Sequence, residues 1–347
     1  MTPREALFDV DDLAPELPVC DHYAGVEVRM HKSLELQRQL GPVFDVTLDC
    51  EDGAAVGGEA EHAHLCAEMV MSAANLHGRV GVRMHPVDHP AFAAVAQTLI
   101  ARAGTRLAYL MLPKPRSLAD VERAICEIDR LHQVHDIRRD IPVHGLIETH
   151  GALRQVDAIA AHPRIESLSF GLMDFVSAHR GAIPASAMSA HGQFSHPLVA
   201  RAKLEIAAAC HAHGKTPSHC VVTEFNDMHV LAEAARRAAR EFGCTRMWSI
   251  HPDQIRPIIA AFAPTTAEVD QAIEIVQAAQ AADWAPIRHG DTLHDRASYR
   301  YYWHVLARAE RTGQPLPAQV RLQFFAAPAV PPDPPPGSGQ NAALRVC

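Results

Sequence analysis

FDVTLDCEDGA, residues 44–54, begins as an apolar run of strand type and ends in a group of acidic residues. Two later stretches share this design: VGVRM, residues 80–84, contains Arg83, and VHGLIE, residues 143–148, ends in Glu148. Short apolar and β-branched runs with polar boundaries are typical of buried strands. Each stretch therefore predicts a strand with a charged side chain near its carboxyl end.

Eight such runs occur, and helix-forming segments separate them. They are PVCDHY (18–23), FDVTLD (44–49), VGVRM (80–84), AYLML (108–112), VHGLIE (143–148), SLSF (167–170), SHCVV (218–222) and MWSI (247–250). One intervening segment, VLAEAARRAAREFG, ends in Gly243, a residue typical of helix C-termini. Strands that alternate with helices pair in parallel, so eight units predict an α/β fold, the (β/α)₈ TIM barrel. A doubly wound open sheet is the alternative, but no G-x-G-x-x-G follows a strand.

The chain has 347 residues, enough for one barrel and an appendage. We expect the barrel at 1–262, a C-terminal helical extension at 263–326 and a disordered Pro/Gly-rich tail at 327–347. In the extension, Thr265 or Thr266 is expected to cap a helix. FVSAHRGAIPASAMSAHGQFSHP, between strands six and seven, predicts a long loop near the mouth of the barrel.

Composition excludes several classes of protein. The formal net charge is −8 and there is no long basic run, so we expect no nucleic-acid partner. No apolar stretch approaches the length of a membrane span and the first residues are acidic, which predicts a cytoplasmic protein without a membrane partner. Eight cysteines lack any C-x-x-C pair, which disfavours a zinc knuckle or redox dithiol and leaves zinc as a minor alternative. Cys50 and Cys220 are interpreted as packing residues.

The predicted strands end mostly in charged residues. These are Asp49, Glu51, Asp52, Arg83, Lys114, Glu148, Asp174, Glu224 and His251. Barrels of this type carry their active sites at the carboxyl ends of the strands, so these side chains should converge on one mouth. A structural salt-bridge network under the loops is the alternative interpretation.

A cluster of Glu51, Asp52, Glu148 and Asp174 would repel itself unless a cation lay among its members. Oxygen ligands favour Mg²⁺, with Mn²⁺ as a second choice. Arg83 is expected to bind a substrate carboxylate through its two parallel donors. Lys114 is expected to bind substrate electrostatically, with a Schiff base as the alternative.

The motifs in order resemble the citrate lyase beta-subunit and malyl-CoA lyase family of the HpcH/HpaI aldolase superfamily. The matching phrases are FDVTLDCEDGA, VRMHP, LPKPRS, LIETHGAL, RIESLSFGLMDF, and IHPDQIRPI followed by FAPTTAEVDQA. This resemblance implies Mg²⁺-dependent cleavage or formation of 3-hydroxyacyl-CoA thioesters such as malyl-, citramalyl- or citryl-CoA. It implies Glu148 and Asp174 as the metal ligands and Arg83 as the residue that orients the substrate.

The resemblance also extends to GDTLHDRASY, which places Asp295 where some relatives carry an acid that reaches a neighbouring subunit. It thus implies Asp295 as general base or acid in a homotrimer or homohexamer, whereas the residues alone also fit a helix N-cap. Two departures, LPVCDHYAG in the first strand and His85 after Arg83, keep a free hydroxy-keto acid open as the substrate. A non-catalytic barrel that binds small carboxylates is the third alternative.

Overall fold

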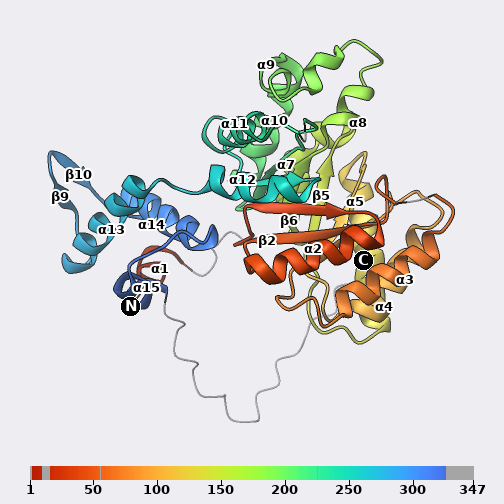
Figure 1. The fold of residues 1–347 in the computed structure, drawn as a ribbon, viewed down its shortest axis with the longest axis horizontal. Coiled ribbons are helices and arrows are strands. Elements are labelled where there is room, and N and C mark those ends of the chain that lie inside the picture. Colours follow the sequence, from red (N-terminus) through yellow and green to blue (C-terminus); the bar gives the residue numbers. More distant parts are fainter. Residues whose placement is uncertain (1, 10–15, 55, 225, 326–347) are drawn as a thin grey trace, which may run out of the picture. The chain divides into compact units, whose positions relative to one another are not determined.

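The computed structural model describes residues 2–9, 16–54, 56–224 and 226–325, and its largest unit is a closed parallel barrel of eight strands (Figure 1). The strands are β1 (Cys20–Ala24), β2 (Phe44–Asp49), β3 (Val80–Arg83), β4 (Leu110–Leu112), β5 (Val143–Ile147), β6 (Ile165–Phe170), β7 (Thr216–His219) and β8 (Arg246–Ser249). Each pairs with its neighbour in sequence, and β1 pairs with β8 to close the ring. The predicted (β/α)₈ barrel is confirmed.

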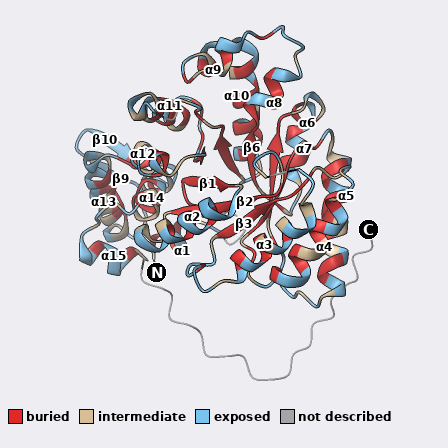
Figure 2. Ribbon diagram, turned by 45° about the vertical axis from the view of Figure 1, so that its right-hand side comes forward, coloured by how far each residue is buried: buried red, intermediate tan, exposed pale blue. Residues whose placement is uncertain are grey.

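Helices follow the strands and bury one face against the barrel (Figure 2). They are α2 (Glu27–Leu40), α3 (Glu59–Met71), α4 (Phe92–Ala103), α5 (Leu118–Val134), α6 (His150–Arg154), α7 (Val156–Ala161), α8 (Leu172–Ser177), η2 (Ala185–Met188), α9 (Gly192–Ser195), α10 (Pro197–Ala212), α11 (Met228–Arg240) and α12 (Pro252–Phe262). In α11 the residues Leu231, Ala234 and Ala238 recur at helical spacing and are buried. The Asp227 side chain caps the first turn of α11, and Gly243, shortly after the last residue of the helix, adopts a left-handed φ of 67°.

The segment between strands six and seven differs from the predicted loop because much of it is helical. It contains the end of α8, then η2 and α9, and α10 begins at Pro197. Its backbone contacts the loop that follows β7, where the Ala190 N–H donates to Glu224 Oε1 at 2.8 Å. The segment therefore lies beside the mouth of the barrel, as expected from its length.

The inside of the barrel is polar at the end where the strands begin. Successive strand residues point to opposite faces, so Asp45, Thr47 and Asp49 of β2 share the inner face. Arg246 of β8 is fully buried, with Nη1 2.6 Å from Asp45 and Nη2 3.3 Å from Asp21 of β1. This inner ion cluster of Asp21, Asp45 and Arg246 joins three strands, and sequence reasoning did not predict it.

A second compact unit contains elements from both parts of the chain. It comprises α1 (Pro3–Leu7), α13 (Thr266–Ala281), β9 (Ile287–His289), β10 (Thr292–His294), α14 (Arg296–Arg311) and α15 (Ala318–Phe325). Thr265 caps α13 and exchanges hydrogen bonds with Glu268. The barrel unit runs up to Ala263 and also includes Arg311–Gly313. The sequence predicted the first residues of the chain as part of the barrel. They belong to the second unit because Leu7 is buried in its apolar core.

The expected tail at 327–347 lies outside the described residues. Within the described ranges, no helix combines the length and the apolar character that crossing a bilayer requires.

Candidate active site

Asp49, the last residue of β2, organises one side of the mouth. It receives Arg83 Nε on Oδ1 at 2.7 Å and Arg83 Nη2 on Oδ2 at 2.5 Å, a bidentate pair between adjacent strand ends. It also accepts the backbone N–H groups of Glu51 at 2.9 Å and Gly53 at 2.8 Å, so it shapes the acidic turn that follows β2. A Cβ on Gly53 would lie 2.3 Å from Asp49 Oδ2, so the turn requires glycine here.

Arg83 is almost buried, and its hydrogen-bonding groups are unequally engaged. Asp49 occupies its Nε–Nη2 edge, while Nη1 lies 3.0 Å from Glu51. The guanidinium also lies over the ring of Tyr23, 5.4 Å from its centre, and Tyr23 packs on Trp248. Arg83 therefore has a carboxylate on each side, Asp49 on its Nε–Nη2 edge and Glu51 beside Nη1. Tyr23 and Trp248 were missed, since an aromatic residue inside a strand has no sequence signal beyond packing.

Lys114, just after β4, places its ammonium group among acidic side chains. Nζ lies 2.6 Å from Glu51, 2.9 Å from Asp52 and 3.7 Å from Asp174. Burial alone would lower its pKa, but the hydrogen bonds with Glu51 and Asp52 outweigh burial and raise the pKa of Lys114. For Asp52 the directions are reversed. Burial alone would raise its pKa, but the hydrogen bond and charge of Lys114 outweigh burial and lower the pKa of Asp52. A protonated amine is not a nucleophile, so these contacts favour the electrostatic role over the Schiff base.

Glu148 is the carboxylate of the site that lacks a basic partner. It is buried, and Oε1 accepts the backbone N–H of Lys114 at 2.7 Å. That N–H is available because Lys114 adopts a left-handed φ of 50°. Burial, followed by repulsion from Asp174, raises the pKa of Glu148 to about 8. A Cβ on Gly171 would lie 2.1 Å from Glu148 Oε2, so Gly171 leaves room for this carboxylate.

The mouth thus gathers more negative than positive groups. Its carboxylates are Asp49, Glu51, Asp52, Glu148 and Asp174, and its basic side chains are Arg83 and Lys114. Asp49 and Arg83 neutralise each other, and Lys114 pairs mainly with Glu51 and Asp52 in the turn after β2. Glu148 and Asp174 are therefore left without a matching positive charge. Carboxylate oxygens that lack a cation are suitable ligands for a divalent ion, so the side chains fit Mg²⁺.

The other strand-end residues have local partners. Glu224 binds the Ala190 N–H, and His251 caps α12 by accepting from Asp253 N at 3.3 Å. Asp295 lies in the second unit and caps α14, where its Oδ1 accepts the backbone N–H groups of Ala297 at 3.0 Å and Ser298 at 3.2 Å. The capping role expected from the residues alone is therefore present.

Cys220 is a buried packing residue, and its Sγ lies 3.0 Å from Gln193 Oε1. Cys50 has a different environment, because its Sγ lies 3.6 Å from Cys66 Sγ.

Several known proteins are similar to this chain in sequence and fold. A family model described as HpcH/HpaI aldolase/citrate lyase matches residues 43–252. A crystal structure of a citrate lyase from Burkholderia xenovorans LB400 is 56% identical, with a TM-score of 0.82, and the match covers 93% of this chain and 100% of that one. An L-malyl-CoA/beta-methylmalyl-CoA lyase from Cereibacter sphaeroides is 28% identical over 247 residues, 68% of this chain and 77% of that protein.

The protein CitE from Mycobacterium tuberculosis, solved with magnesium, acetoacetate and coenzyme A, shares the fold. It is 20% identical, has a TM-score of 0.64, and the match covers 85% of this chain and 98% of that one. The acidic turn, the strand-end arginine and the paired carboxylates all lie within the matched family region. The chain therefore belongs to the HpcH/HpaI aldolase/citrate lyase family and is an enzyme of the lyase class.

Proposed function

We propose that this chain is a Mg²⁺-dependent lyase that cleaves or forms a carbon–carbon bond in 3-hydroxyacyl-CoA thioesters such as malyl-, citramalyl- or citryl-CoA. The observation that carries the proposal is the pair Glu148 and Asp174, which lies at the barrel mouth without a sufficient counter-charge. Relatives named malyl-CoA lyases and a related fold solved with magnesium and coenzyme A support it.

Glu148 and Asp174 would hold Mg²⁺, or Mn²⁺ in its place, through their carboxylate oxygens. When bound, the ion favours negative charge on a substrate carbonyl oxygen. Lys114 remains beside Asp174 and keeps the turn of Glu51 and Asp52 in place. Arg83, oriented by Asp49, presents Nη1 to the carboxylate or keto-acid end of the substrate.

In the cleavage direction, the bond between C2 and C3 of the hydroxyacyl group breaks. The C3 hydroxyl loses its proton and becomes a carbonyl, and the bonding electrons move to C2, which then takes up a proton. We assign this last proton transfer to Asp295 of a neighbouring subunit in a homotrimer or homohexamer, because a carboxylate that binds a cation carries no proton to donate to C2.

Glu51 is the second acid that we assign to catalysis, together with Asp52 beside it. Burial raises the pKa of Glu51, and Arg83 opposes this only in part. A carboxyl group with a raised pKa between Arg83 and Lys114 can exchange a proton near the substrate oxygen.

The test is the release of glyoxylate and acetyl-CoA from malyl-CoA by the purified chain, with Mg²⁺ and with EDTA. We expect turnover that needs the metal, at least a 100-fold loss in Glu148→Gln, and little change in the control Glu224→Gln. Turnover of a free hydroxy-keto acid but not of the thioester would establish the aldolase alternative. Binding of malyl-CoA without turnover would count against this thioester as the substrate.

A further inference from the structure

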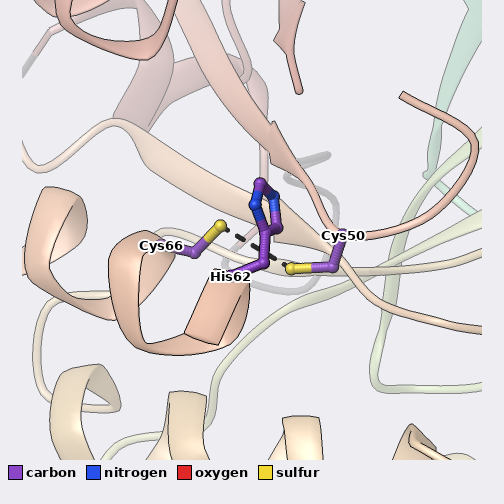
Figure 3. A group of neighbouring side chains, drawn as sticks. All are labelled: Cys50, His62 and Cys66. Atoms are coloured by element: carbon purple, nitrogen blue, oxygen red, sulfur yellow. Dashed lines mark hydrogen bonds between the residues drawn. The ribbon is translucent and has the colours of Figure 1, made fainter. Parts of the chain in front are cut away.

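Three side chains behind the acidic turn form a separate group of possible metal ligands. Cys50 follows Asp49 directly, while His62 and Cys66 lie one helical turn apart on α3 (Figure 3). One ligand atom of each lies within 4.8 Å of the others. Within the described part of the chain, no other group of three or more His, Cys, Asp or Glu side chains comes together in this way.

The two sulfur atoms have the spacing of a tetrahedral site. Their separation is 3.6 Å. Two thiolates at the usual zinc–sulfur bond length of ~2.3 Å, at a tetrahedral angle, would lie about 3.8 Å apart. Little movement is therefore needed for both to bind one ion.

The hydrogen bond of His62 gives its ring a defined protonation. Nε2 lies 2.8 Å from the backbone oxygen of Asp49, and a carbonyl can only accept, so Nε2 carries the hydrogen. In the neutral ring Nδ1 then holds a lone pair, and no hydrogen bond among the described residues uses it. Histidines that bind metals typically donate their second N–H to a backbone carbonyl in this manner.

The environment favours a metal over a redox pair. Cys50 and Cys66 are both buried, whereas His62 is only partly buried, so solvent approaches from the histidine side. Contact with the Cys50 thiol, and then burial, raise the pKa of Cys66 well above its usual value. Buried, protonated thiols react slowly with oxidants, while a metal ion can displace their protons.

We infer that Cys50 Sγ, Cys66 Sγ and His62 Nδ1 form a site for one zinc ion, with a water molecule as the fourth ligand. Two thiols lose their protons to solvent when the ion binds, so zinc affinity rises with pH. The ion would join α3 to the turn after β2, which carries Glu51 and Asp52. The site is distinct from the Mg²⁺ site in residues and in ligand type, since sulfur and imidazole select zinc over magnesium.

The experiment measures zinc in the full-length chain after growth with zinc and gel filtration. We expect about one zinc per chain, and after replacement by Co²⁺ the absorption bands of a tetrahedral cobalt–thiolate complex. His62→Asn and Cys66→Ser should each lower zinc affinity at least tenfold in a chelator competition. Cys210→Ser, which removes another buried thiol, is the matched control and should retain zinc. Glu148→Gln should also retain it, so this test is independent of the proposed lyase reaction.

Two results would overturn the inference. One is that the wild-type protein binds no more zinc than Cys66→Ser, although circular dichroism shows that both proteins are folded. The other is a thiol titration under denaturing conditions on wild-type protein that contains no zinc. If it finds two free thiols fewer than the reduced protein has, Cys50 and Cys66 form a disulfide instead of a metal site.

Discussion

Glu148 should make the stability of the metal-free protein fall as pH rises. Its pKa is about 8 in the folded chain, against 4.5 for an ordinary glutamate. A carboxyl group with a raised folded pKa favours the folded state fully below pH 4.5, and this contribution is lost as pH rises through 8. The largest slope is about 1.4 kcal/mol per pH unit, which gives a loss of roughly 3 kcal/mol between pH 5 and pH 8.

The assay is urea unfolding in EDTA at several pH values in this range, with the free energies of wild type and Glu148→Gln compared at each. Other groups titrate too, so the difference between the two proteins is the informative quantity. Glutamine accepts the same Lys114 N–H but does not ionise. The variant should therefore match wild type near pH 5 and exceed its stability by roughly 3 kcal/mol near pH 8.

Glu166→Gln is the control for this experiment. Glu166 is also a shielded carboxylate, and burial raises its pKa, but its hydrogen bond with His144 outweighs burial and lowers it. It stays ionised across the range and should contribute no slope. Saturating Mg²⁺ should abolish the fall in wild-type stability with pH, because Mg²⁺ would bind the ionised form of Glu148 and so favour it in the folded protein. Parallel curves for wild type and Glu148→Gln would refute the assignment of the pKa.

Three further outcomes test other parts of the structure. Asp174→Asn should lower Mg²⁺ affinity at least tenfold in calorimetry while the circular dichroism is unchanged; equal affinity would remove Asp174 from the metal site. Arg246→Met should destabilise the barrel by roughly 3–5 kcal/mol in urea unfolding, because it leaves Asp21 and Asp45 buried without it and only Arg79, 3.7 Å from Asp45, nearby. A loss below about 1 kcal/mol would contradict this. Asp295→Asn should keep stability, since asparagine also caps helices, yet lose proton exchange at the substrate carbon. Mixing its subunits with Glu148→Gln subunits should restore activity if Asp295 acts in trans; no recovery despite subunit exchange would leave it as a cap.

The barrel and most of its mouth are predictable from the sequence because the decisive signals are local. Alternation of short strands with helices requires parallel pairing, and the end of a strand defines where its next polar residue will lie. FDVTLDCED therefore predicts Asp49, Glu51 and Asp52 at the mouth, where the fold places them. Thr265 is recognisable for the same reason, since a helix cap depends on residues only three apart.

Contacts between distant strands could not be predicted from one sequence. Nothing in VGVRM indicates that one edge of Arg83 is taken by Asp49, or that Lys114 supplies part of the positive charge that the acidic cluster needs. Leu7 resembles any apolar residue, and only the fold shows that it belongs with α13 and α14. Cys50 and Cys66 gave no spacing signal because they are 16 positions apart, one just after a strand and the other on the following helix.

The inner ion cluster of Asp21, Asp45 and Arg246 has a consequence for how this barrel can change over evolutionary time. An apolar replacement of Arg246 alone leaves two carboxylates in the core without it, whereas replacing all three residues together by residues of similar volume need not weaken the fold. Arg246 should thus accept an apolar substitution only in combination with changes at Asp21 and Asp45, and double-mutant cycles between β1, β2 and β8 should show strong coupling. Attempts to graft this mouth onto another barrel would have to transfer the buried floor beneath it as one unit.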